Sequence, residues 1–200
     1  MKKGGITLLK GIALTMVLTL LCSFYVHTTF ANQPSQTEAL EAVIRETLLQ
    51  DGNDIKSSVK VKLIRLDKVP QKNYYIALFS FKSYSSTYLG EASFIKENNE
   101  YQYAGGHGYG VNRIHSKTIT VDKQLYSIFY GENFNKRLGS ISIEFPNKTF
   151  KYKIKSVDSP YFVHFQKLPI VDKKEAYPSK ITCYDQKHRK LTWQQCARVK

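Results

Sequence analysis

One stretch of this sequence, residues 139–166, alternates apolar and polar side chains more regularly than the rest of the chain. A period of two residues places alternate side chains on opposite faces of a β-strand. The segment Pro146-Asn147-Lys148 divides the stretch in two, so it predicts an antiparallel hairpin with one buried and one exposed face. The predicted buried face comprises Ile141, Ile143, Phe145, Phe150, Tyr152 and Ile154.

The opposite face of this hairpin is basic and is our candidate binding surface. Its lysines are Lys148, Lys151, Lys153 and Lys155. Such lysines can bind an anionic partner, but they can equally be the solvated outer face of ordinary strands.

The first residues have the features of an export signal. Lys2, Lys3 and Lys10 precede an uncharged apolar run, and Thr29-Phe30-Ala31 resembles a signal-peptidase site. We predict a signal peptide over 1–31 and a secreted or envelope-associated protein. An N-terminal membrane anchor is the alternative, because the run is long for a signal peptide and short for a membrane span.

Charge restricts the partners that we expect. The leader holds three lysines and no acidic residue, so the formal charge of +14 falls to +11 after cleavage. A basic exported chain associates with anionic surfaces. We therefore expect an anionic cell-wall polymer, a membrane surface or a partner protein, and no nucleic acid.

Residues 34–105 predict a helix followed by antiparallel strands. Ser35 and Glu38 have the spacing of a capping box, and apolar residues then recur at helical spacing. The strand pattern beginning at Val59 slips at residues 63–64, which indicates a bulge. Residues 73–82 are apolar on both faces and predict a central strand. A hairpin follows, with strands at 88–95 and 101–103.

A glycine-rich segment, GGHGYG at 105–110, interrupts this pattern. Four glycines in six residues are unfavourable inside a strand, so we predict a loop that joins the two halves of the chain. Its His107 and Tyr109 are further candidate site residues. An alternative function is therefore a secreted hydrolase or metal-dependent enzyme centred on this loop, although the glycine order fits no nucleotide-binding motif.

Residues 118–200 predict a second half made of short strands separated by turn residues, typical of a β-sandwich. Cys183 and Cys196 are the cysteines outside the leader, and an even number in an exported chain predicts a disulfide. We expect them on a closing hairpin with its turn at 189–190 or a wider loop, and with Trp193 packed nearby. The predicted fold class is mainly β with one N-terminal helix: an α+β first half and an antiparallel β-sandwich-like second half.

Motifs for chemistry are absent from the sequence. It lacks a nucleophile elbow and the spaced histidines and cysteines of a zinc site. We expect no cofactor, no metal and no catalytic residue, so these features favour a binding protein over an enzyme.

Three stretches resemble uncharacterised exported proteins of low-GC Gram-positive bacteria: YGENFNKRLGSISIEF at 130–145, SPYF at 159–162 and KITCYD at 180–185. The C-terminal halves of those proteins resemble small β-sandwiches closed by a Tyr-Asp-x-x-Gly hairpin. Here His188 or Arg189 stands in place of that glycine, and the cysteines are an addition. The resemblance implies a fold but no activity.

These features together predict an exported, non-catalytic, envelope-associated protein. It would bind an anionic polymer or a partner protein through basic strand faces.

Overall fold

The computed structural model describes residues 35–50, 55, 58–133, 136–146, 150–155, 157, 159–169 and 173–197. The chain divides into two compact units, Met1–Ala39 and Leu40–Lys200, and the first contributes only residues 35–39 to the described part. The predicted signal peptide or anchor and Lys148 lie outside the described residues. No described helix has both the length and the apolar character needed to cross a bilayer.

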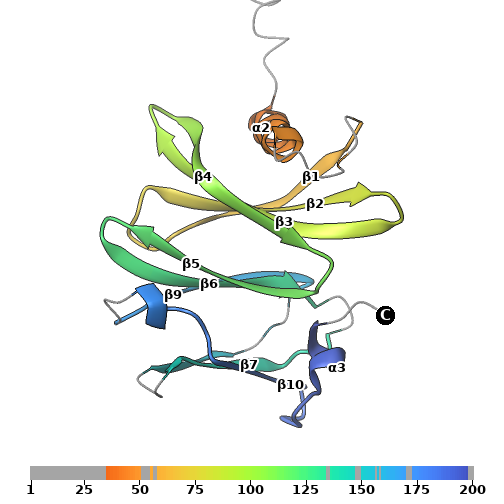
Figure 1. Ribbon diagram of the computed structural model, residues 1–200, viewed down its shortest axis with the longest axis vertical. Coiled ribbons are helices and arrows are strands. Elements are labelled where there is room, and N and C mark those ends of the chain that lie inside the picture. Colours follow the sequence, from red (N-terminus) through yellow and green to blue (C-terminus); the bar gives the residue numbers. More distant parts are fainter. Residues whose placement is uncertain are drawn as a thin grey trace, which may run out of the picture. The chain divides into compact units, whose positions relative to one another are not determined.

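The described strands form three antiparallel sheets, and the predicted fold class, mainly β with one N-terminal helix, is confirmed (Figure 1). We call them the first sheet (β1-β2-β3-β4), the middle sheet (β5-β6-β9) and the last sheet (β10-β7-β8). The elements are α2 (Gln36–Gln50), β1 (Val61–Lys68), β2 (Tyr74–Ser83), β3 (Ser86–Glu97), β4 (Glu100–Gly110), β5 (Ile114–Val121), β6 (Gln124–Glu132), β7 (Ser140–Glu144), β8 (Lys151–Lys155), β9 (Tyr161–Lys167), η2 (Lys173–Glu175), β10 (Lys180–Tyr184) and α3 (Trp193–Ala197).

Helix α2 begins with the predicted capping box. The Ser35 amide donates to the Glu38 carboxylate at 2.7 Å, and the Glu38 amide donates to Ser35 Oγ at 3.3 Å. Two amides that lack helical partners are thereby satisfied. Further along the helix, Leu40, Ile44 and Leu48 are buried at the spacing of a single helical face.

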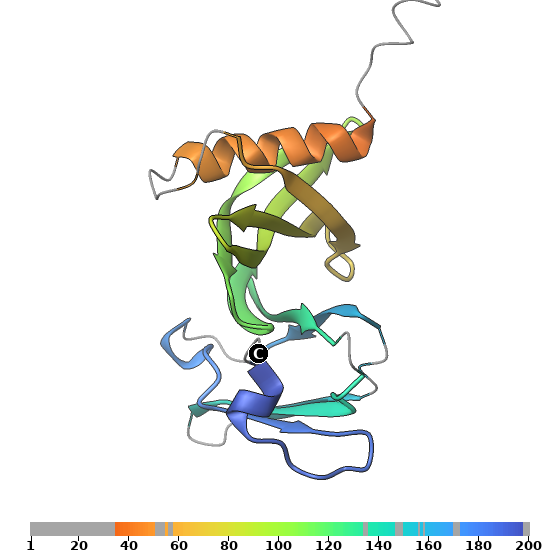
Figure 2. The same ribbon diagram turned by 90° about the vertical axis from the view of Figure 1, so that its right-hand side faces the viewer.

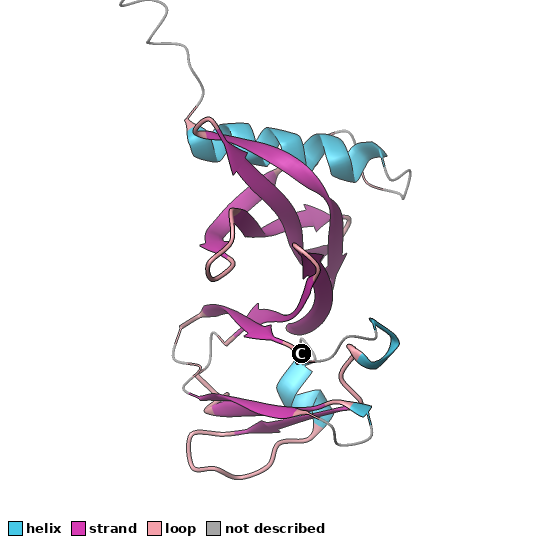
Figure 3. Cartoon of the chain, turned by 90° about the vertical axis from the view of Figure 1, so that its left-hand side faces the viewer, coloured by secondary structure: helices cyan, strands magenta, loops and turns pink. Residues whose placement is uncertain are grey.

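Three apolar clusters hold the second unit together in layers (Figures 2 and 3). Phe79 belongs to the cluster between α2 and the first sheet. Leu78 and Ile128 belong to the cluster between the first and middle sheets. Phe129 and Ile141 belong to the cluster between the middle and last sheets. Neighbouring residues of β2 and of β6 thus lie in different clusters, so both strands bury both faces.

Several local predictions are confirmed. Strand β2 is central in its sheet, and the pairing of β1 with β2 shifts register between Leu63 and Arg65, as the slipped pattern indicated. The Glu41 carboxylate of α2 accepts the Leu63 amide at this bulge. In the last sheet, Ile141 pairs with Ile154 and Ile143 with Tyr152. The predicted apolar face of this hairpin is buried or partly buried throughout.

The predicted loop at 105–110 is wrong, because β4 continues to Gly110 and the link to the middle sheet is residues 111–113. Gly105 and Gly106 have φ of +80° and +70°, a conformation that favours glycine. They lie where the pairing of β3 with β4 shifts register, between Ala92 and Phe94. The first two glycines therefore form a bulge inside a strand.

The remaining glycines make room for larger side chains. A Cβ on Gly108 would lie 2.8 Å from Glu91 Oε1, and one on Gly110 would lie 2.8 Å from His115 Cε1. Glu91, in β3, is only 2% exposed. Gly108 therefore leaves room for this carboxylate, and Gly110 leaves room for the His115 ring.

The predicted closing hairpin is also wrong, although its disulfide forms between Cys183 and Cys196. Cys183 lies in β10 but Cys196 lies in α3, and Tyr184 faces Lys190 where the hairpin required Gln195. The Thr192 amide donates to Gln195 Oε1 at 2.9 Å, and the Gln195 amide donates to Thr192 Oγ1 at 3.3 Å. This second capping box begins a helix where a strand was expected.

We expect Gly108→Ala to lower the free energy of unfolding by about 1–3 kcal/mol, because the new methyl group overlaps a buried carboxylate. Chemical denaturation would measure this. In a Glu91→Ala background the same substitution should cost much less, since the overlapping atom is gone. Equal costs in both backgrounds would contradict the steric explanation.

Candidate binding surface

The outer face of the last sheet carries the predicted lysines, and we call it the basic face. Lys151, Lys153 and Lys155 of β8 are exposed, and so is Lys180 of β10. No described helix or strand covers this side of the sheet (Figures 1 and 2). Sequence reasoning missed Lys180, which only the pairing of β10 with β7 brings to the same face.

Strand register arranges the basic face in three rows. Glu144 lies between Lys151 and Lys180, and its carboxylate accepts from Lys151 Nζ at 3.0 Å. In the next row, Lys153 Nζ lies 5.4 Å from the ring centroid of Tyr184, which belongs to the third row. Within the described residues, these rows place four lysines against a single carboxylate.

The central strand of this face is less exposed than its polar residues suggested. Ser140 and Ser142 alternate with the apolar residues of β7, yet they are only 3% and 6% exposed. Each is paired with a lysine of β8, Lys155 or Lys153, whose aliphatic stem can cover a small neighbour. The exposed charge of the face therefore comes from its two edge strands.

The other two candidate residues do not join this surface. Tyr109 lies in β4, where its ring contacts Phe81 and Tyr88 at centroid distances of 5.3 and 5.9 Å. It packs with the cluster between α2 and the first sheet. His107 lies in the same strand, paired with Ala92, but its side chain is outside the described part of the structure.

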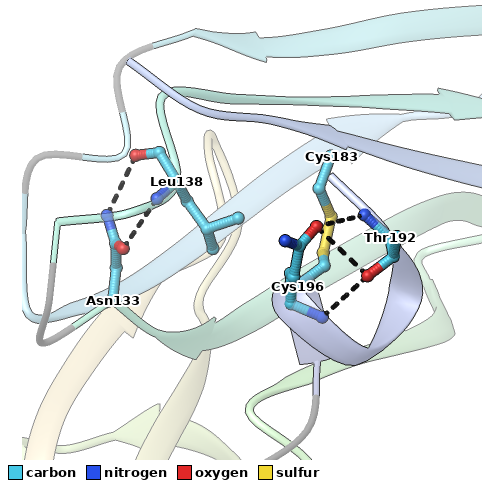
Figure 4. The surroundings of a disulfide bond; sticks show 6 residues. Asn133, Leu138, Cys183, Thr192 and Cys196 are labelled. Carbon is cyan, nitrogen blue, oxygen red and sulfur yellow. Dashed lines mark hydrogen bonds between the residues drawn. A yellow bond between two sulfur atoms is a disulfide. The ribbon is translucent and has the colours of Figure 1, made fainter. Parts of the chain in front are cut away.

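Cys183 and Cys196 join the last sheet to α3 and are both buried (Figure 4). Nearby, the buried Asn133 side chain bonds both backbone groups of Leu138: Nδ2 donates to the carbonyl and Oδ1 accepts from the amide, each at 3.0 Å. These bonds fix the chain just before β7 begins.

A second polar cluster lies between the first and middle sheets. Lys117 Nζ of β5 donates to the two Glu91 oxygens at 3.0 and 3.1 Å. The His115 ring stacks on Tyr130 with centroids 5.1 Å apart, and its Nε2 donates to the Asn112 carbonyl at 2.7 Å. Sequence reasoning missed this cluster, since isolated charges in alternating strands look like solvent-facing positions.

Burial is the main cause of the pKa shifts of Glu91, Tyr130 and His115 in this cluster. Desolvation raises the pKa of Glu91 to about 7, although the Lys117 ammonium acts in the opposite direction. Burial raises the pKa of Tyr130 and lowers the pKa of His115. Among the described residues, no group of three or more His, Cys, Asp or Glu is placed to hold a metal ion.

Glu91 gives a pH dependence with a defined sign. Its pKa is raised on folding, so between about pH 4.5 and 7 the folded chain binds a proton that the unfolded chain has lost. Stability from this group is therefore greatest at low pH and falls as the pH rises through 7. The total change should not exceed about 3 kcal/mol.

We expect the difference in unfolding free energy between the wild type and Glu91→Gln to decrease from pH 5 to pH 8. Denaturation at several pH values would measure it, with Glu97→Gln at the exposed end of β3 as the control. A difference that stays constant or increases with pH would contradict the assigned shift.

No family model, no curated protein and no solved structure matches this chain.

Proposed function

We propose that this protein is an exported, non-catalytic binding protein of the cell envelope, and that its basic face binds an anionic polymer. The observation that carries the proposal is the placement of Lys151, Lys153, Lys155 and Lys180 on one sheet face that no described helix or strand covers. The high net positive charge of the chain supports the same class of partner.

The geometry of β8 suits an extended, repeating ligand. Alternate residues of a strand are about 7 Å apart and point the same way. The three lysines of β8 therefore form a line of positive charges, to which Lys180 adds a fourth across the sheet. A linear polymer with one negative charge per repeat can contact several of these ammonium groups together, whereas a single small anion can contact only one or two.

The alternative, an enzyme centred on residues 105–110, required a loop that presents His107 and Tyr109. That segment is part of β4, and the Tyr109 ring is packed against Phe81 and Tyr88. We therefore do not propose this alternative.

The triple variant Lys151→Glu/Lys153→Glu/Lys155→Glu should weaken binding to isolated bacterial cell walls by at least about tenfold, because it replaces a line of attractive charges with repulsive ones. A sedimentation assay at about 0.1 M salt would measure binding. Wild-type binding should fall steeply as salt increases, since screening weakens exposed charge contacts.

The matched control is Lys60→Glu/Lys62→Glu/Lys82→Glu, which makes the same change in net charge at exposed positions around the first sheet. It should retain most binding. Equal losses in the two triple variants would show that net charge alone matters, and wall binding that persists in molar salt would overturn the electrostatic proposal. A Lys→Gln version of the first triple variant, with thermal melts, separates loss of binding from loss of folding.

Vesicles of anionic phospholipid test whether the basic face binds a membrane surface instead of a wall polymer. Binding to vesicles but not to walls would overturn the assignment to a polymer.

A further inference from the structure

A cavity of about 490 Å³ lies beside the disulfide, at the edge of the last sheet. After β10, the chain turns and pairs back with it only briefly: Tyr184 faces Lys190, and the Leu191 amide donates to the Cys183 carbonyl at 2.9 Å. It then leaves the sheet to form α3. The cavity occupies the space that opens between β10 and α3.

The lining of this cavity includes an exposed aromatic residue and an exposed cation. Trp193 is the only tryptophan in the sequence and is 47% exposed, although we expected it to be packed. Lys190 is exposed at the same cavity, and Thr182 lines it from β10. An indole ring can stack on the apolar face of a sugar ring, while an ammonium group attracts a carboxylate or phosphate.

The cavity adjoins the basic face. Thr182 pairs with Ser142 in the middle row of that face and also lines the cavity. The lysines of β8 lie at the opposite edge of the sheet, so a polymer that crosses the basic face from β8 to β10 can place one of its units beside Trp193. An acidic peptide would satisfy Lys190 and the basic face as well, but it offers no sugar ring to the exposed indole.

We propose that this cavity is a subsite for one acidic sugar unit of the bound polymer. The inference rests on the proposed function and adds a substrate class to it: a glycan that carries carboxylate or phosphate groups. In this assignment the lysines of the basic face supply most of the attraction, and the cavity selects a sugar ring among anionic ligands.

The disulfide is part of this subsite. Helix α3 has five described residues, too few to form a stable helix alone. The bond between Cys183 and Cys196 holds it against β10, and both cysteines line the cavity. The subsite should therefore exist only in the oxidised protein.

The single tryptophan allows a direct test on the wild-type protein. A hexamer of galacturonic acid or the monomer glucose 6-phosphate should change the intrinsic fluorescence of Trp193 with saturation. Because the hexamer also contacts the basic face, the two charge groups are compared as monomers: a response to galacturonic acid but not to glucose 6-phosphate, or the reverse, would distinguish a carboxylate from a phosphate ligand. Inorganic polyphosphate, which has charge but no sugar ring, should bind the basic face and leave the fluorescence unchanged.

Variants then separate the subsite from the basic face. Trp193→Ala should weaken binding of the galacturonate hexamer by at least about fivefold, measured by calorimetry, and leave polyphosphate binding unchanged. Tyr177→Ala removes another exposed aromatic side chain that does not line the cavity, and it should affect neither ligand. In Cys183→Ser/Cys196→Ser, which retains Trp193, the fluorescence response should disappear while polyphosphate still binds.

Polyphosphate binding that is lost in the triple lysine variant, with no fluorescence response to either sugar in the wild type, would overturn the subsite and leave the proposed function intact. A poly-glutamate peptide that changes the fluorescence as strongly as the hexamer would overturn the assignment to a sugar. Absence of any binding to polyphosphate, walls or hexamer would overturn the proposed function itself.

Discussion

The structure of the second unit depends on strands that bury both faces. In β2, Leu78 faces the middle sheet while Phe79 lies under α2, and in β6, Ile128 and Phe129 contribute to clusters on opposite sides of their sheet. A sheet buried in this way has no face left for charged residues. Exposed charge is consequently concentrated on edge strands, connections and the outer face of the last sheet. The basic face is thus a consequence of the layered architecture as well as of the lysine-rich sequence of β8.

A charged pair of the described residues nevertheless lies inside this apolar stack. Glu91 and Lys117 bridge the first and middle sheets, where desolvation disfavours the ionised carboxylate. The two groups fit because Gly108 presents no side chain to the Glu91 oxygens. A glycine-rich strand and a buried ion pair, which are separate features in the sequence, are therefore a single structural feature in three dimensions.

The sequence was informative wherever local periodicity determines structure, and less so where tertiary contacts do. The capping box at Ser35, the β1 bulge and the β7–β8 hairpin follow from spacing alone. The strand at 105–110 could not be predicted in this way, because Gly108 and Gly110 are explained by Glu91 and His115, which are distant in sequence. The prediction of a strand where helix α3 forms failed for a different reason. The signal of this helix, Thr192 followed three residues later by Gln195, is present in the sequence, but the same residues also fit the returning strand of a hairpin closed by a cross-strand disulfide.

The candidate site was also predictable only where the periodicity of one strand identifies its residues. Alternation in β8 identified Lys151, Lys153 and Lys155, whereas Lys180 required knowledge of which strand pairs with β7. The disulfide connects the two proposals. A bridge across 13 residues can contribute about 3 kcal/mol by restricting the unfolded chain. Among the described side chains of helix α3 only Cys196 is fully buried, so the position of the helix depends largely on that contribution. Such a bridge persists in oxidising compartments, which are where an export signal would deliver the chain. A subsite that requires the disulfide would therefore form only after export, when the polymer that we propose as its ligand is within reach.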